Sequence, residues 1–71
     1  MTPEQIEFIF TYHPPTPEQQ KKYEEVNRIF VEAAKLLDPL MPDGPGKTAA
    51  IRKLSDARMG VNAAIALEGR F

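Results

Sequence analysis

The chain has 71 residues, with nine Lys or Arg against ten Asp or Glu, a single histidine and no cysteine. One domain of this size buries only about 60% of its unfolded surface, so a lone monomer would be marginally stable. The net charge of −1 argues against binding to DNA, RNA or a membrane surface, because these partners need a basic excess. The absence of cysteine excludes disulfides, thiolate metal sites and thiol nucleophiles, and one histidine leaves no histidine pair for a metal. No apolar stretch approaches the roughly 20 residues of a membrane span. We therefore expect a soluble, oligomeric, non-enzymatic protein of a reducing compartment that needs no cofactor.

Charge is unevenly distributed along the chain. Residues 1–46 carry eight acidic and four basic side chains, whereas residues 47–71 carry five basic and two acidic ones. Opposite charges favour packing of the two parts against each other, within one chain or between chains. The alternative interpretation is that the cations of the second part bind a small anionic ligand.

Seven prolines divide the chain into three segments with helical periodicity. Thr2-Pro3-Glu4-Gln5 and Thr16-Pro17-Glu18-Gln19 both match a capping box with proline at the first helical position. They predict helices over residues 3–10 and 17–38, the second ended by Pro39. Residues 39–46 contain three prolines and two glycines and predict a loop. A third helix is predicted over residues 46–68, with Gly69 as its stop. The predicted fold is all-α: one domain, residues 1–71, with a short N-terminal helix and a long antiparallel helical hairpin, assembled as an oligomer.

The two long helices both predict extensive packing. Apolar residues of the second helix recur at alternating spacings of three and four, the pattern of an amphipathic helix that packs along a coiled-coil-like seam. They are Tyr23, Val26, Phe30, Ala33, Leu37 and Leu40, with Ile29 and Leu36 widening the stripe on one side. The third helix is apolar around most of its circumference between residues 61 and 67, where Asn62 is the only polar residue. One partner helix cannot cover such a surface, so we infer self-association and a hydrogen-bond partner for Asn62 across an interface.

Gly60 lies in the interior of the third helix, where glycine costs about 1 kcal/mol relative to alanine. Together with Ala57 and Ala64 it forms a narrow face that another backbone can approach closely. We interpret this face as the crossing point of another helix. That helix is either the long helix of the same chain or the same helix of a second subunit. The alternative is that Gly60 is a weak position of the helix with no packing role.

The loop before the third helix contains Gly44-Pro45-Gly46-Lys47-Thr48, which shares its last residues with the nucleotide-binding P-loop. The full motif needs a glycine at position 41, which is Met41, and a preceding strand, where a helix is predicted. The sequence therefore excludes a nucleotide triphosphatase. The free amides at the start of the third helix, beside Lys47 and the Thr48 hydroxyl, still predict an anion site. The alternative is that Thr48 only starts the helix.

Tyr12-His13-Pro14-Pro15 places two rings and two prolines in a segment that cannot be helical. The prolines restrict the backbone, so the Tyr12 ring would be held in place before a ligand arrives. A ring of this kind stacks on a nucleobase for about 1–3 kcal/mol. We predict Tyr12 and Pro14 as ligand-binding residues and interpret His13 as a surface histidine. The alternative is that Tyr12 and Phe10 pack the short helix onto the long one.

Polar residues on the two long helices are further candidates for ligand binding. Asn27 and Arg28 lie just beside the apolar stripe of the second helix, where either could contact a phosphate or a base edge; the alternative is an ordinary solvated position. Arg58 falls on or beside the apolar stripe of the third helix. A buried arginine needs a partner, which is Asp38, Glu32 or a bound anion.

Four strings in this sequence resemble a known family in their order and spacing. They are FTYHPP (residues 10–15), KYE (22–24), RKL (52–54) and NAAIA (62–66). Over about residues 8–66 the chain is similar to the phage anti-CBASS cyclic-nucleotide sponges. The resemblance implies a small all-helical protein that assembles as a hexamer from interlocked dimers. It also implies that the protein sequesters cyclic di- and trinucleotides, such as 3′,3′-cyclic GMP-AMP, in the host bacterial cytoplasm without cleaving them, and so starves the effector of antiphage signalling.

Carried over by position, the resemblance makes Tyr12 the base-stacking ring of a dinucleotide site. The polar contact on the second helix is then Asn27 or Arg28, and the sequence does not decide between them. Asn27 would be the weaker contact, because the family often has a basic residue there.

A separate trinucleotide site is implied at the start of the third helix, at Thr48 with Lys47 and Arg52 nearby. Two positions depart from the family pattern. Gly60 stands where a bulky aromatic residue is expected, and Leu67-Glu68 follow NAAIA where a basic residue is expected. The second departure favours dinucleotide binding over trinucleotide binding.

Two functions of other classes compete with the sponge hypothesis. A helical protein-interaction module, such as an inhibitor adaptor that binds a host protein through the third helix, would expose an apolar patch and bind no nucleotide. A small RNA-binding protein is disfavoured by the net charge of −1, which lacks the excess of phosphate-contacting cations.

Overall fold

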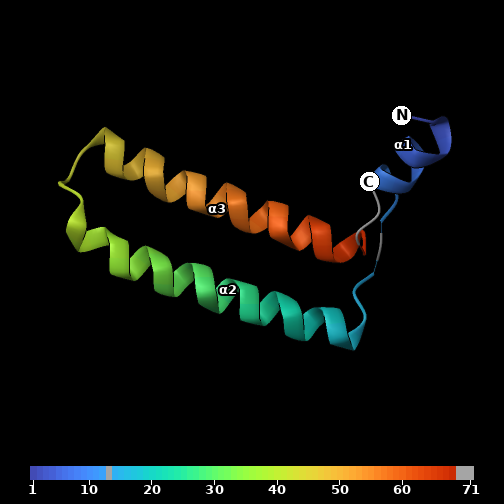
Figure 1. Cartoon of the computed structure of the whole chain (residues 1–71), viewed down its shortest axis with the longest axis horizontal. Helices are drawn as coiled ribbons and strands as arrows, with labels where there is room; N and C mark the ends of the chain where they lie inside the picture. The colour runs from blue at the N-terminus through green and yellow to red at the C-terminus, as the bar shows by residue number, and fades with distance from the viewer. Residues whose placement is uncertain (13, 69–71) are drawn as a thin grey trace.

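The computed structural model describes residues 1–12 and 14–68, so the predictions for His13 and Gly69 lie outside the described residues. The chain forms α1 (Pro3–Phe10), α2 (Pro17–Leu37), the short 3-10 helix η1 (Asp38–Leu40) and α3 (Pro45–Ala66). Figure 1 shows α2 and α3 running antiparallel side by side, with α1 beyond the open end of this hairpin. The prediction of an all-α fold with a short first helix and a long hairpin is confirmed.

Both predicted capping boxes are present. The Thr2 hydroxyl accepts from the Gln5 N–H at 3.1 Å while the Gln5 side chain accepts from the Thr2 N–H at 2.9 Å. Thr16 and Gln19 form the same reciprocal pair at 3.1 and 3.0 Å. Each box satisfies two backbone donors of the first turn that would otherwise lack a partner, so the sequence fixes where α1 and α2 begin.

The helix ends differ slightly from the prediction. α2 ends at Leu37, one residue early, because Pro39 cannot continue the α-helical hydrogen bonds and the chain tightens into η1 instead. α3 ends at Ala66, two residues early. Glu68 has a φ of 54°, a left-handed conformation that stops the helix, and its N–H donates to the Ile65 carbonyl at 3.2 Å.

The hairpin packs through one face of each long helix. Tyr23, Val26, Phe30 and Ala33 of the predicted stripe are half-buried, facing α3, whose half-buried residues include Ile51, Leu54 and Ile65. Leu37 and Leu40, at the far end of the stripe, stay exposed. Among the described residues none is fully buried, so the single chain has a seam of contact rather than a core.

The chain exposes more surface than a compact protein of its mass. Its accessible surface is 5687 Å², whereas a folded monomer of 8.0 kDa has roughly 4,500 Å². Its radius of gyration is 15.4 Å, against about 11 Å for a compact domain of this length. The excess is consistent with a subunit whose apolar faces are covered by other copies.

Gly60 does not pack within the chain. A Cβ built at this position meets no heavy atom within 4 Å. The interpretation that Gly60 admits the long helix of the same chain is therefore wrong, because no atom of that helix lies within 4 Å of such a Cβ. The other interpretation, a close approach by a second subunit, stays a prediction.

Candidate functional site

The Tyr12 ring lies open to solvent at the open end of the hairpin. Tyr12 is 80% exposed and Phe10 is 86% exposed. The alternative that these rings pack α1 onto α2 is therefore wrong for the single chain. Thr11 ends α1, with its N–H and hydroxyl both donating to the Glu7 carbonyl at 3.0 and 2.7 Å. The ring is thus presented by a capped helix end on one side and by the exposed Pro14 on the other.

A hollow of about 240 Å³ lies beside this segment, where α2 begins and α3 ends. Its lining includes Phe8, Pro14, Gln19 and Leu67. Gln19 joins the two helices here, because its Nε2 donates to the Ile65 carbonyl at 3.3 Å while its Oε1 serves the capping box. The structure therefore places Pro14 against the hairpin end and leaves the Tyr12 ring outside the hollow.

Asn27 and Arg28 point to different neighbours, although they are adjacent in sequence. Asn27 faces α3, where its Oδ1 accepts a hydrogen bond. Arg28 turns along the outside of α2 and donates to Glu25, one turn earlier, with its Nε at 3.1 Å from the carboxylate. This hydrogen bond is the main cause of a lowered pKa for Glu25 and a raised pKa for Arg28. The Arg28 cation is thus already matched by a carboxylate.

Arg58 has a neutral partner instead of the predicted acidic one. Its Nη1 donates to Asn27 Oδ1 at 3.2 Å. Among the described residues neither Asp38 nor Glu32 lies within ion-pair distance of it, so the prediction of those partners is wrong. Sequence reasoning singled out both Asn27 and Arg58 but missed that they meet.

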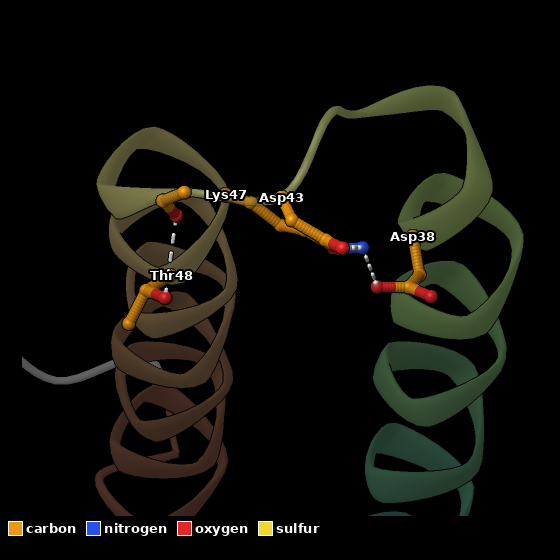
Figure 2. Close-up of polar contacts among 5 residues, drawn as sticks. Asp38, Asp43, Lys47 and Thr48 are labelled. Carbon is orange, nitrogen blue, oxygen red and sulfur yellow. Dashed lines mark hydrogen bonds and ion pairs between the residues drawn. The ribbon is translucent and has the colours of Figure 1, made fainter.

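The turn between α2 and α3 is closed by the Lys47 ammonium group. Figure 2 shows Lys47 reaching from the start of α3 across to the end of α2. Its Nζ lies 2.8 Å from Asp38 and 3.0 Å from Asp43, and its side chain is only 19% exposed. Hydrogen bonds to Asp38 and then Asp43 raise the pKa of Lys47.

The predicted anion-binding residues near this turn are partly brought together. Thr48 follows Lys47 in the first turn of α3, and its hydroxyl donates to the Gly44 carbonyl at 3.5 Å (Figure 2). Gly44 has a φ of 147°, a conformation that other residues rarely adopt, so this turn needs a glycine before Pro45. Arg52 is exposed one turn further along α3. Lys47, the cation nearest to the helix start, is already shared by two carboxylates.

Asn62 is half-buried on α3, and its Oδ1 is buried without a hydrogen-bond donor among residues 1–12 and 14–68. A buried acceptor of this kind costs free energy unless it is satisfied. The prediction that it finds a donor across an interface is not tested by the single chain. In the described part of the chain no cluster of His, Cys, Asp or Glu could hold a metal ion. None of the described helices is long and apolar enough to cross a membrane.

Comparison with known proteins identifies a family. A family model described as the Acb2/Tad1 hairpin domain matches residues 2–66, which span α1, α2 and α3. No curated protein and no solved structure matches the chain.

Proposed function

Because the chain belongs to the Acb2/Tad1 hairpin-domain family of anti-CBASS sponges, which sequester cyclic nucleotides, we propose that it binds cyclic dinucleotides and holds them intact. Family membership over residues 2–66 is the observation that carries this proposal. Bound dinucleotide is withheld from the effector of CBASS signalling in the infected cell. The protein needs no catalytic group for this function.

The exposed Tyr12 ring supports a stacking role. A ring that is 80% exposed in the single chain keeps its face free for a nucleobase. Stacking of one base on an aromatic ring contributes about 1–3 kcal/mol and needs no particular base. Thr11 fixes the backbone before the ring through its two hydrogen bonds to Glu7, which lowers the entropy lost on binding.

The distance between the two predicted contacts supports a site shared by two copies. Asn27 follows Pro17 by ten residues, or about 15 Å along the axis of α2. Tyr12 lies two residues after the end of α1, and Figure 1 shows α1 beyond the open end of the hairpin. One chain therefore holds the ring and the polar contact far apart. We propose that the ring of one copy and the polar groups of another hold the same dinucleotide, in a homo-oligomer such as the hexamer that the resemblance implies.

A second site, for cyclic trinucleotides, stays a prediction at Lys47, Thr48 and Arg52. A phosphate at this position would have to compete with Asp38 and Asp43 for the Lys47 ammonium group. We therefore expect dinucleotides to bind more tightly than trinucleotides.

Calorimetric titration with 3′,3′-cyclic GMP-AMP tests the proposal. We expect saturable binding to the wild type, affinity roughly 5- to 150-fold weaker for Tyr12→Ala, and a change of only a few-fold for Tyr12→Phe, which keeps the ring. Mass spectrometry of the nucleotide released by heating should recover it intact. Equal affinity of Tyr12→Ala and wild type would refute the stacking role, and a cleaved nucleotide would refute sequestration.

A protein-interaction module without a nucleotide ligand is the second candidate. The exposed apolar side chains Ile6, Ile9 and Phe10 of α1 favour it, because such a surface suits a partner protein. Light scattering together with the titration separates the two functions. A monomer that ignores cyclic nucleotides supports the interaction module, whereas an oligomer that binds them supports the sponge.

A further inference from the structure

Arg58 occupies the middle of α3, on the face that packs against α2. The residue is half-buried, and one of its Nη atoms donates to Asn27 Oδ1 at 3.2 Å. Asn27 accepts this hydrogen bond from the facing helix and so fixes one end of the guanidinium group. The other N–H donors of the guanidinium have no protein acceptor among the described residues.

The charge of Arg58 is not neutralised by any of the described residues. Arg28 has Glu25 as its partner, and Lys47 has Asp38 and Asp43. None of the described carboxylates pairs with Arg58. A partly desolvated cation with only a neutral amide beside it is costly unless an anion completes its surroundings.

A groove beside the guanidinium is the right size for one part of a ligand. The groove measures about 200 Å³ between α2 and α3. Asn27, Ser55 and Arg58 are its polar lining residues, and Phe30 and Leu54 are among the apolar ones. Sites that enclose whole small molecules measure about 300–1,000 Å³, so this groove is too small for a complete dinucleotide. Its mostly apolar walls suit an uncharged part of the ligand, and Arg58 supplies the charged group among its lining residues.

We propose that Arg58 is the phosphate-contacting cation of the cyclic-dinucleotide site and that Asn27 is a positioning residue that holds its guanidinium. The inference rests on the proposed function. Guanidinium presents its N–H groups in a planar fork that matches two phosphate oxygens, and charge-assisted hydrogen bonds of this kind are about twice as strong as neutral ones. Because Asn27 takes only one donor and adds no charge, the fork stays available to the ligand. Asn27, a candidate for the polar contact on α2, therefore acts on the ligand indirectly, by positioning Arg58 of α3.

Titration of 3′,3′-cyclic GMP-AMP against Arg58→Gln tests the inference. This variant keeps a polar side chain but loses the charge. We expect its dissociation constant to rise about 10-fold or more, the equivalent of one hydrogen bond to a charged group. Lys53→Gln removes an equal charge from an exposed position on α3 and should bind like the wild type. Light scattering and circular dichroism should show the same assembly and helix content for all these proteins.

Asn27→Asp separates ligand binding from a structural role. A carboxylate at this position would pair with the guanidinium, so a purely structural contact predicts equal or greater thermal stability and unchanged affinity. We expect greater stability together with weaker affinity, because the carboxylate competes with the phosphate.

The possible outcomes are distinct. If the dissociation constant of Arg58→Gln lies within two-fold of the wild-type value while Tyr12→Ala loses affinity, the role of Arg58 is overturned and the proposed function stands. A wild type that takes up no 3′,3′-cyclic GMP-AMP overturns both. If Arg58→Gln does not fold, the arginine Nε–H resonances of the wild type decide, since the Arg58 signal must shift when this nucleotide is added. An unmoved Arg58 signal at saturation overturns the inference.

Discussion

Leu36→Glu should dissociate the assembly without unfolding the hairpin. Ile29, Leu36 and Leu40 follow one another at spacings of seven and four, which places them on one face of α2 and η1. Their exposed fractions are 50, 65 and 77%, so this face, which we term the outer stripe, is left uncovered by α3. Self-association would cover it. Leucine and glutamate have similar helix propensities, so the replacement leaves α2 intact.

The magnitude follows from the exposed fraction of Leu36. Full burial of a leucine side chain contributes about 1.5–3 kcal/mol. With 65% of the residue still exposed in the single chain, about 1–2 kcal/mol remains to be gained on assembly. A symmetric contact contains Leu36 of both copies, so replacing it weakens the association of two copies by about 2–4 kcal/mol, or roughly 30- to 1,000-fold.

Sedimentation equilibrium and light scattering measure this change directly. The wild type should have the mass of an oligomer at micromolar concentration, and Leu36→Glu should have a smaller mass at the same concentration. Gln20→Glu, which adds the same charge at another exposed position of α2, should keep the wild-type mass. A Leu36→Glu protein with the full wild-type mass would show that the outer stripe is not the assembly surface. A stable wild-type monomer would refute self-association altogether.

Four further substitutions test the local structure. Thr16→Ala removes the cap of α2 and should lower the free energy of unfolding by about 1 kcal/mol. Thr2→Ala should lower it by only a few tenths of a kcal/mol, because α1 lies outside the hairpin. Urea denaturation of both variants measures the difference. Lys47→Met should lower the melting temperature at neutral pH. The pKa of Lys47 is raised in the folded protein, so its ion pairs stabilise the fold fully at pH values below the ordinary pKa of 10.5. This stabilisation is lost as the pH rises through the folded pKa. The melting temperatures of the two proteins should therefore converge at high pH. Gly60→Ala should strengthen the helix by about 1 kcal/mol yet weaken association, as followed by light scattering of diluted samples.

The fold was predictable because its signals are local. Each capping box lies within four consecutive residues, and the prolines that end or interrupt the helices act on their immediate neighbours. The predicted ends of α2 and α3 were one and two residues too late, because Pro39 already draws Asp38 into the 3-10 turn and the left-handed conformation of Glu68 has no clear signal in the sequence. Neither residue is a strong breaker of helices by itself.

The contacts between the helices were less predictable, although the register of the hairpin contains the missing signal. Asp38 and Lys47 lie equally far from the middle of the turn, and so do Asn27 and Arg58. In an antiparallel hairpin with a tight turn, residues at equal distances from the turn lie opposite each other. Sequence reasoning assigned Arg58 a partner by charge, which favoured acidic residues, and did not count outward from the turn.

The exposed Tyr12 ring and the Arg58 guanidinium could not be joined into one site from the sequence, because one chain does not bring them together. The ring lies beyond the open end of the hairpin, and the guanidinium lies in the middle of α3. If two copies complete the site, dinucleotide binds only to the assembled protein, and binding and assembly must strengthen each other by the same free energy. Dilution should then weaken binding, and 3′,3′-cyclic GMP-AMP should hold the oligomer together at concentrations where the free protein dissociates. Affinity that is independent of protein concentration, in a range where the mass changes, would place the whole site within one chain.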